Sequence, residues 1–161
     1  MFAIILAAAA IACPVEQARY VLRDAPAVTA AFFPVEGGPD WPQRVALKVD
    51  TGQGRYWFLP YDGGTSGITR VASTTDVQAP GWKPPHPDGG PRPLGDLEYL
   101  AADATWRLIE GAPGRGQPAP AHIFLSELDD RLRHPPGDQP RDSVPRQFFD
   151  LAACGAAKPH R

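Results

Sequence analysis

Two cysteines, Cys13 and Cys154, stand near opposite ends of the 161-residue chain and are the only two that it has. A disulfide between them would close a loop of about 140 residues, and the simple chain-entropy model values such a closure at about 4–5 kcal/mol. It would also tie together two ends that otherwise fray. We therefore predict a Cys13–Cys154 disulfide, with free thiols as an alternative.

The residues before the first cysteine favour export. Residues 2–12 are all apolar, and Ala10-Ile11-Ala12 fits the small-x-small pattern that a signal peptidase reads. The run is too short for a transmembrane span. We predict a signal peptide over residues 1–12 and a periplasmic or extracellular mature chain over residues 13–161. The run is also short for a signal peptide and lacks a basic residue at its start, so an upstream start or a buried N-terminal element stays open.

A lipid anchor is the rival chemistry for the first cysteine. Ala10-Ile11-Ala12-Cys13 resembles a bacterial lipobox, although Ala10 stands where leucine is usual. Lipidation would leave Cys154 as an odd thiol in an oxidising space. The anchor is therefore less favoured than the disulfide, and it would imply a structural protein of the bacterial envelope.

Four histidines could supply a general base or a metal ligand. None of their spacings fits a helical zinc site, and the chain has no Cys-x-x-Cys. His86 and Asp88 lie two residues apart, where both could face one ligand. Ser66 lacks the Gly-x-Ser-x-Gly elbow of the α/β-hydrolases and fits a turn. We expect no metal and no cofactor; a hydrolase with a dispersed site, using His86 or His122 as base, is the enzymatic alternative.

Aromatic side chains in loops are the strongest candidates for binding. Trp41, Tyr61 and Trp82 lie in or beside Pro- and Gly-rich segments, and Trp57 lies in a predicted hairpin. Such rings offer a large contact area at low entropic cost and stack on sugars or prolines. The alternative is that they fold back onto the core. The predicted ligand-binding residues are Trp41, Trp57, Tyr61, Trp82, His86 and Asp88.

The charge of the chain narrows the class of partner. The formal net charge is −2, and no run of Lys or Arg forms a basic stripe. Nucleic-acid binding needs such a stripe, and a membrane-surface helix needs a basic amphipathic face that is also missing. We expect a protein or a glycan as the partner.

Strands must position most of these residues, because 20 Pro and 16 Gly leave little room for long helices. The clearest unit is RVALKVDTGQGRYWFLPY, in which Val45, Leu47 and Val49 alternate with other residues. It predicts a hairpin whose two turn glycines we expect at positive φ. Alternation requires that either Tyr56 and Phe58, or Trp57 and Leu59, face the core.

The remaining segments predict further short strands and one helix. Residues 96–111 fit a helix or a strand; the strand is favoured, with ATWRLI leading into the hairpin loop GAPGRGQPAP. SELDDRLRH fits a short helix with Ser126 as N-cap. Residues 76–96 form a long loop, which is more often functional than a linker. Other expected strands are ARYVLRD, VTAAFFPV, ITRVAST, AHIFL and RQFFDLAAC.

These elements predict a mainly β chain. We expect a single-domain antiparallel β-sandwich or barrel with one or two short helices and long Pro/Gly-rich loops. Export, the β architecture and the loop aromatics together favour a binding or interaction module over an enzyme. Its contact surface is expected on the loop 76–96 and the turn 61–67.

Overall fold

A computed structural model describes residues 12–155. The regular elements of the described chain are mostly antiparallel strands, with one short α-helix, α1 (Leu128–Arg133), and two short 3₁₀ turns, η1 (Val15–Gln17) and η2 (Gly64–Ser66). The strands are β1 (Ala18–Leu22), β2 (Ala25–Pro34), β3 (Val45–Asp50), β4 (Arg55–Asp62), β5 (Thr69–Thr74), β6 (Asp96–Ala102), β7 (Leu108–Ile109), β8 (His122–Leu125) and β9 (Phe149–Cys154).

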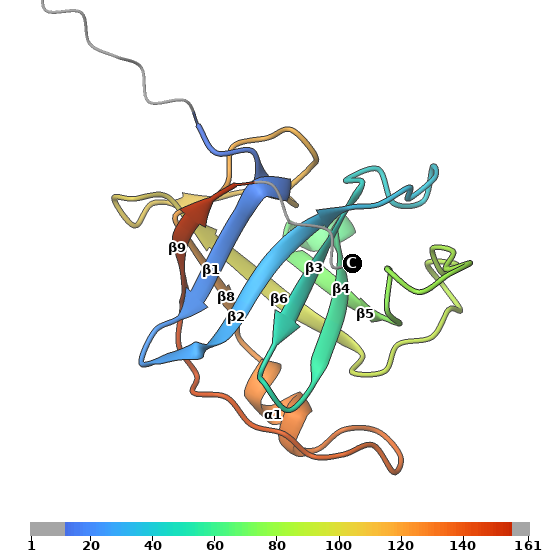
Figure 1. Cartoon of the computed structure of the whole chain (residues 1–161). Coiled ribbons are helices and arrows are strands. Elements are labelled where there is room, and N and C mark those ends of the chain that lie inside the picture. Colours follow the sequence, from blue (N-terminus) through green and yellow to red (C-terminus); the bar gives the residue numbers. More distant parts are fainter. Residues whose placement is uncertain (1–11, 156–161) are drawn as a thin grey trace, which may run out of the picture.

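Eight of the strands close into a barrel (Figure 1). Their order is β5-β4-β3-β2-β1-β9-β8-β6, and pairing of β5 with β6 completes the ring. The strand β7 is an extra one that pairs with the end of β6. The mainly β fold is therefore confirmed, and of the two expected architectures the chain adopts the barrel.

The first and last strands along the chain meet at the predicted disulfide. Cys13 and Cys154 are joined, with their Cα atoms 5.7 Å apart. The bond lies beside the first and last strands, which pair antiparallel with Ala18 opposite Cys154. The disulfide prediction is confirmed, and the bond secures the seam between the first and last strands of the barrel.

The core has two parts, one inside the barrel and one outside it. The inner cluster includes Tyr20, Leu22, Phe32, Phe58 and Tyr99. Tyr20 and Leu22 share the inner face of β1, as the two-residue period of a strand requires. The outer cluster packs β2, β3, β4 and β5 against the long loops, and its members are Val35, Trp41, Ala46, Trp57, Leu59 and Ala72, with Phe33, Tyr61, Val77 and Trp82 at its edge.

The β3–β4 hairpin is confirmed, with one correction at its turn. Gly52 has a positive φ of 82°, as expected, but Gly54 does not. A Cβ on Gly54 would instead collide with the ring of Tyr56. Gly54 is therefore required for the close approach of a side chain and not for its backbone angle.

Between β6 and β8 the predicted hairpin is wrong. Residues 96–102 form a strand, as favoured, but the ATWRLI segment is mostly a turn followed by the two residues of β7. Both β7 and β8 pair with β6, not with each other. The turn forms because the Asp103 carboxylate accepts hydrogen bonds from the backbone N–H groups of Thr105 and Arg107.

The predicted helix exists as α1, but Ser126 does not cap it. The N-cap position is Glu127, which makes no side-chain capping bond. Ser126 donates to the Glu98 carboxylate at 3.2 Å instead. The helix is held by its apolar face, because Leu128 and Leu132 are both buried in the inner cluster, as their spacing predicts.

The N-terminal prediction lies almost wholly outside the described residues, since the structure begins at residue 12. Across residues 12–155, every helix is too short or too polar to cross a membrane.

Candidate functional site

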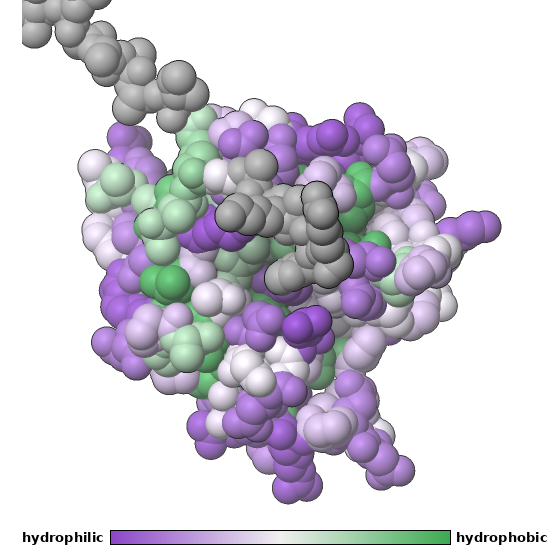
Figure 2. Space-filling view, viewed as in Figure 1, coloured by the Kyte–Doolittle hydropathy of each residue, from purple (hydrophilic) through white to green (hydrophobic). Residues whose placement is uncertain are grey.

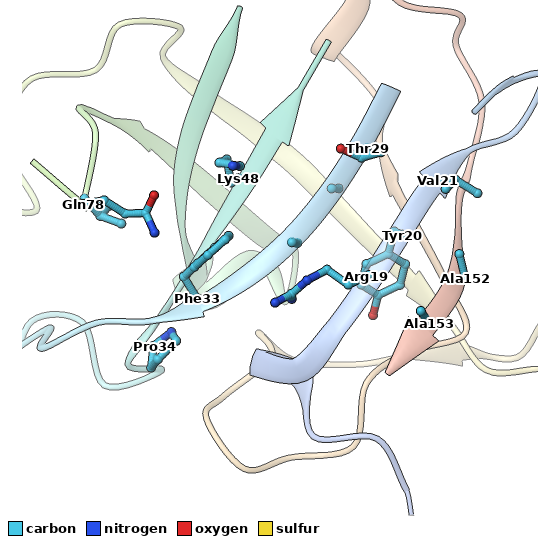
Figure 3. A pocket seen from close by; sticks show the side chains of 13 residues that line it. Arg19, Tyr20, Val21, Thr29, Phe33, Pro34, Lys48, Gln78, Ala152 and Ala153 are labelled. Atoms are coloured by element: carbon cyan, nitrogen blue, oxygen red, sulfur yellow. The ribbon is translucent and has the colours of Figure 1, made fainter. Parts of the chain in front are cut away.

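A groove of about 770 Å³ runs over the outside of the barrel (Figure 3). Its floor comes from β9, β1, β2 and β3, and Val77 and Gln78 of the loop between β5 and β6 close its far side. On the face drawn in Figure 2, hydrophobic residues gather over β9, with polar residues around them. The groove therefore joins the barrel wall to the loop that the sequence singled out.

Strand register places two cations in one row across this floor. Arg19 of β1 lies opposite Ala31 of β2, and Ala31 lies opposite Lys48 of β3. All three point outward because their neighbours along each strand face the barrel interior. The alanine leaves space between the two long side chains, which forms the hollow of the groove.

Both cations converge on one aromatic ring. The guanidinium carbon of Arg19 lies 5.5 Å from the ring centre of Phe33, and the Lys48 ammonium lies 5.4 Å from the same centre. Lys48 also lies 5.8 Å from the ring of Trp57. Cation–π contact stabilises each charge, but two like charges gathered at one ring also repel each other.

Arg19 has an unsatisfied donor. Its Nη1 donates to the carbonyl of Ala18 at 2.9 Å, whereas its Nη2 is buried and has no hydrogen-bond partner. Burial lowers the pKa of Arg19 from its ordinary value. A buried N–H without an acceptor costs free energy. An acceptor from a bound molecule would remove this cost, because the described chain provides none at Nη2.

The described lining residues of the groove include no Asp or Glu. Apart from the two cations, they are mostly small or apolar side chains, namely Val21, Ala31, Phe33, Pro34, Val77, Ala152 and Ala153, with Thr29 and Gln78 as further polar members. Tyr20 and Ala30 also border the groove, although both side chains belong to the inner cluster. Such a surface can hold a negatively charged group at one place and an apolar body along the rest.

The structure brings the four predicted aromatic residues together, beside this groove and not in an open loop surface. Trp41 and Trp57 are only 4% and 3% exposed. Tyr61 meets Trp41 edge to face and donates to Asp96 at 2.9 Å, while Trp82 packs at the edge of the same cluster. Their shared role in the structure is to pack the long loop onto the outer face of the sheet.

Alternation in β4, together with the loop that covers the strand, explains why Trp57 is buried. Tyr56 and Phe58 point into the barrel, and Trp57 and Leu59 point outward. The outward pair is buried as well, because the loop before β6 covers it. Both faces of this strand are therefore core, which a two-residue period alone does not reveal.

His86 and Asp88 lie together on the exposed part of the same loop. The backbone N–H of Asp88 donates to Nδ1 of His86 at 3.2 Å, and the His86 carbonyl accepts from Gly89 and Gly90. Trp41 fixes the loop here by donating from Nε1 to the carbonyl of Pro85 at 2.8 Å. Within residues 12–155, no three His, Cys, Asp or Glu side chains gather as metal ligands would.

A second cluster, which sequence reasoning missed, surrounds Trp106. This residue is 49% exposed and its ring stacks on His122, with centres 3.8 Å apart and planes 6° apart. Arg23 lies 4.9 Å from the same ring. Phe148 meets the indole edge to face. The four side chains come from four separate segments, so no local motif could have shown the cluster.

Asp150 of β9 holds the polar side of this cluster. Its carboxylate accepts two hydrogen bonds from Arg23, at 2.9 and 2.7 Å, and lies 2.7 Å from Nδ1 of His122. These hydrogen bonds favour the ionised form, and they lower the pKa of Asp150 below its ordinary value. His122 therefore has the carboxylate partner that a general base needs, although its ring is packed between aromatic neighbours.

Comparison of the chain with protein-family models, with curated proteins and with solved structures finds no match.

Proposed function

We propose that this chain is an exported, disulfide-closed β-barrel that binds a small organic anion in the groove over β1, β2 and β3. The observation that carries the proposal is the buried Nη2 of Arg19, which has no acceptor in the described chain. A ligand carboxylate or phosphate at this position would accept from Arg19 and neutralise the repulsion between Arg19 and Lys48. The apolar floor would hold the rest of the molecule.

The proposed function is still the binding module expected from the sequence, but its contact surface is the groove and not the exposed part of the loop 76–96. The exposed stacking platform expected on the loop 76–96 is replaced by the groove that this loop borders through Val77 and Gln78. Trp57 takes part indirectly, because its ring helps to hold Lys48 in place.

Export is the part of the proposal that rests on the N-terminal sequence alone. Intact mass of the chain recovered from its native host tests it. Loss of residues 1–12 and of two hydrogens supports cleavage followed by disulfide formation. A diacylglycerol adduct on Cys13 would support the lipid anchor instead, because the same sulfur cannot form a thioether and a disulfide.

Isothermal titration of the oxidised chain with octanoate, octanol and acetate tests the binding site. Octanoate is expected to bind best, because it alone supplies both the charge and the apolar chain. Arg19→Gln, which removes the charge and leaves a shorter, uncharged polar side chain, is expected to weaken octanoate binding at least about tenfold, the scale of a charge-assisted hydrogen bond. Lys48→Gln should weaken it by less.

The matched control is Arg55→Gln. Arg55 is an exposed arginine at the start of β4 and lies outside the groove. Its substitution should leave octanoate binding unchanged. Equal affinity of octanol and octanoate, or wild-type affinity in Arg19→Gln, would rule out the proposed site.

The hydrolase remains a second candidate, because one observation favours it. His122 lies 2.7 Å from Asp150, which is the pairing that orients a histidine base. A screen of ester substrates with His122→Gln as control tests this candidate. Turnover that this substitution abolishes would support it.

A further inference from the structure

A notch interrupts the barrel where β5 and β7 share one edge of β6. The strand β5 pairs with residues 96–98 of β6, and β7 pairs with Ala101 and Ala102. Between the two pairings lies a cleft of about 220 Å³. It is bordered by Ile68 and Thr69 at the start of β5 and by Leu108 and Ile109 of β7.

The rim of this notch carries most of the large hydrophobic side chains that are exposed in the described chain. Within residues 12–155, the large hydrophobic side chains that are exposed are Ile68, Trp106, Leu108 and Ile109. Three of them line the notch, and Leu108 is 71% exposed. A concentration of exposed apolar side chains at one place marks an interaction site.

The charged residues that line the notch are all acidic. Glu98 and Glu110 line it, and its described lining includes no basic residue. Neither carboxylate forms an ion pair within the described chain; Glu98 accepts only from the Ser126 hydroxyl and lies across the strand pair from Arg70 without bonding to it. The complementary occupant is therefore apolar and positively charged.

The open strand edge beside the notch favours an occupant with an extended backbone. In the described chain β7 pairs with β6 alone. The opposite edge of β7 is an open edge, and an extended segment can add to such an edge through main-chain hydrogen bonds. Successive side chains along a strand point to opposite faces, so Leu108 and Glu110 share one face and Ile109 lies on the other. An added strand in which basic and apolar residues alternate would place its basic side chains on the face of Glu110 and its apolar side chains on the face of Ile109.

We propose that this notch docks an extended segment of a partner protein in which apolar and basic residues alternate. Main-chain bonds to β7 would align the segment, and its apolar side chains would cover Ile109. Its basic side chains would lie along Leu108 with their methylene groups and pair with Glu98 and Glu110. The site is independent of the groove, which lies on β1, β2, β3 and β9 and selects the opposite charge.

The test uses the oxidised full chain and two short acetylated peptides, one alternating valine with lysine and one alternating valine with glutamate. Two-dimensional ¹H–¹⁵N NMR spectra should show shifts at residues 68, 98 and 108–110 with the lysine peptide and not with the glutamate peptide. Glu110→Gln should lower the affinity for the lysine peptide about two- to fivefold. Adding Glu98→Gln should lower this affinity roughly tenfold in total, the scale of two partly exposed ion pairs.

Asp130→Asn is the matched control, since Asp130 is an exposed carboxylate on α1, outside the notch. It should leave the affinity of the lysine peptide unchanged, and Glu98→Gln keeps an oxygen that can accept from Ser126. The proposal is overturned if the shifts fall outside the notch, if both peptides bind equally, or if the double variant binds as the wild type does.

Discussion

Arg19 and Lys48 lie on either side of Ala31 in one row across three strands, and the charged groups of both converge on the ring of Phe33. Two cations gathered over an apolar floor, one of them with a buried unsatisfied N–H, form a receptor for an anion. This relationship links strand register, which sets the row, to the binding that we propose.

The disulfide should contribute a large share of the stability of the barrel. Replacing both Cys13 and Cys154 with serine removes the link across the seam between β1 and β9. We expect the free energy of unfolding to fall by about 2–5 kcal/mol, because the unfolded chain regains the entropy of a long loop. Urea unfolding of the variant, and of the wild type with and without reductant, measures the change. Equal midpoints would show that the seam is held by strand pairing alone.

All four tyrosines should resist ionisation near their ordinary pKa of about 10. Burial and hydrogen bonds to Asp142 and Asp96 raise the pKa of Tyr56 and of Tyr61 to about 12. Burial raises the pKa of Tyr20 and Tyr99 further. The ultraviolet absorbance of the folded chain should show almost no tyrosinate at pH 10, where a tyrosine of ordinary pKa is about half ionised. At pH 11 only about a tenth of Tyr56 and of Tyr61 should be ionised.

The same shifts set the sign of the alkaline stability change. The unfolded chain loses the phenol protons near the ordinary pKa, whereas the folded chain keeps them. The stabilisation is therefore fully present below about pH 10 and is lost as the pH rises through the folded pKa values near 12. Unfolding free energies that stay constant from pH 9.5 to about pH 11.5 would contradict this linkage.

Asp150 should make the barrel sensitive to acid. Arg23 and His122 lower the pKa of its carboxyl group in the folded chain, so the unfolded chain takes up the proton first as the pH falls. The stabilisation is complete above the ordinary value of about 3.9 and is lost as the pH falls through the folded pKa. Asp150→Asn should lower stability at neutral pH by roughly 1 kcal/mol, and the difference from wild type should shrink below about pH 4. A difference that is independent of pH would show that packing, not charge, holds Asp150 in place.

At position 106 we expect glycine to be less destabilising than alanine, which is the reverse of their usual order within regular structure. Its φ of 65° is costly for a bulky residue. Glycine adopts this angle freely, so Trp106→Gly should be more stable than Trp106→Ala by about 1 kcal/mol, although both lose the stack on His122. Urea unfolding compares the two variants, and a more stable alanine variant would mean that the turn changes its backbone on substitution.

Much of the fold could be predicted from the sequence, because strands report their burial through alternation. The alternation of Val45, Leu47 and Val49 places them on one face of β3, and all three lie inside the barrel. Trp57 shows where this reasoning stops. Its strand is buried on both faces, since a loop more than 15 residues away along the chain covers the outer one.

The candidate site was harder to predict than the fold. Alternation already directs Arg19 and Lys48 outward, but a charged residue on an outward face is ordinarily solvated. Only the register of β1 on β2 and of β2 on β3 shows that the two share a row. The Trp106–His122 stack was missed for a related reason, because it depends on a positive φ and on the pairing of β6 with β8.

The most direct test of anion binding is a crystal structure of the oxidised full chain with octanoate. We predict the carboxylate within hydrogen-bond distance of Arg19 Nη2 and the hydrocarbon chain along Ala31, Ala152 and Ala153. Octanoate bound elsewhere, or a guanidinium of Arg19 that pairs with a carboxylate of the protein itself and leaves the groove without a ligand, would contradict it.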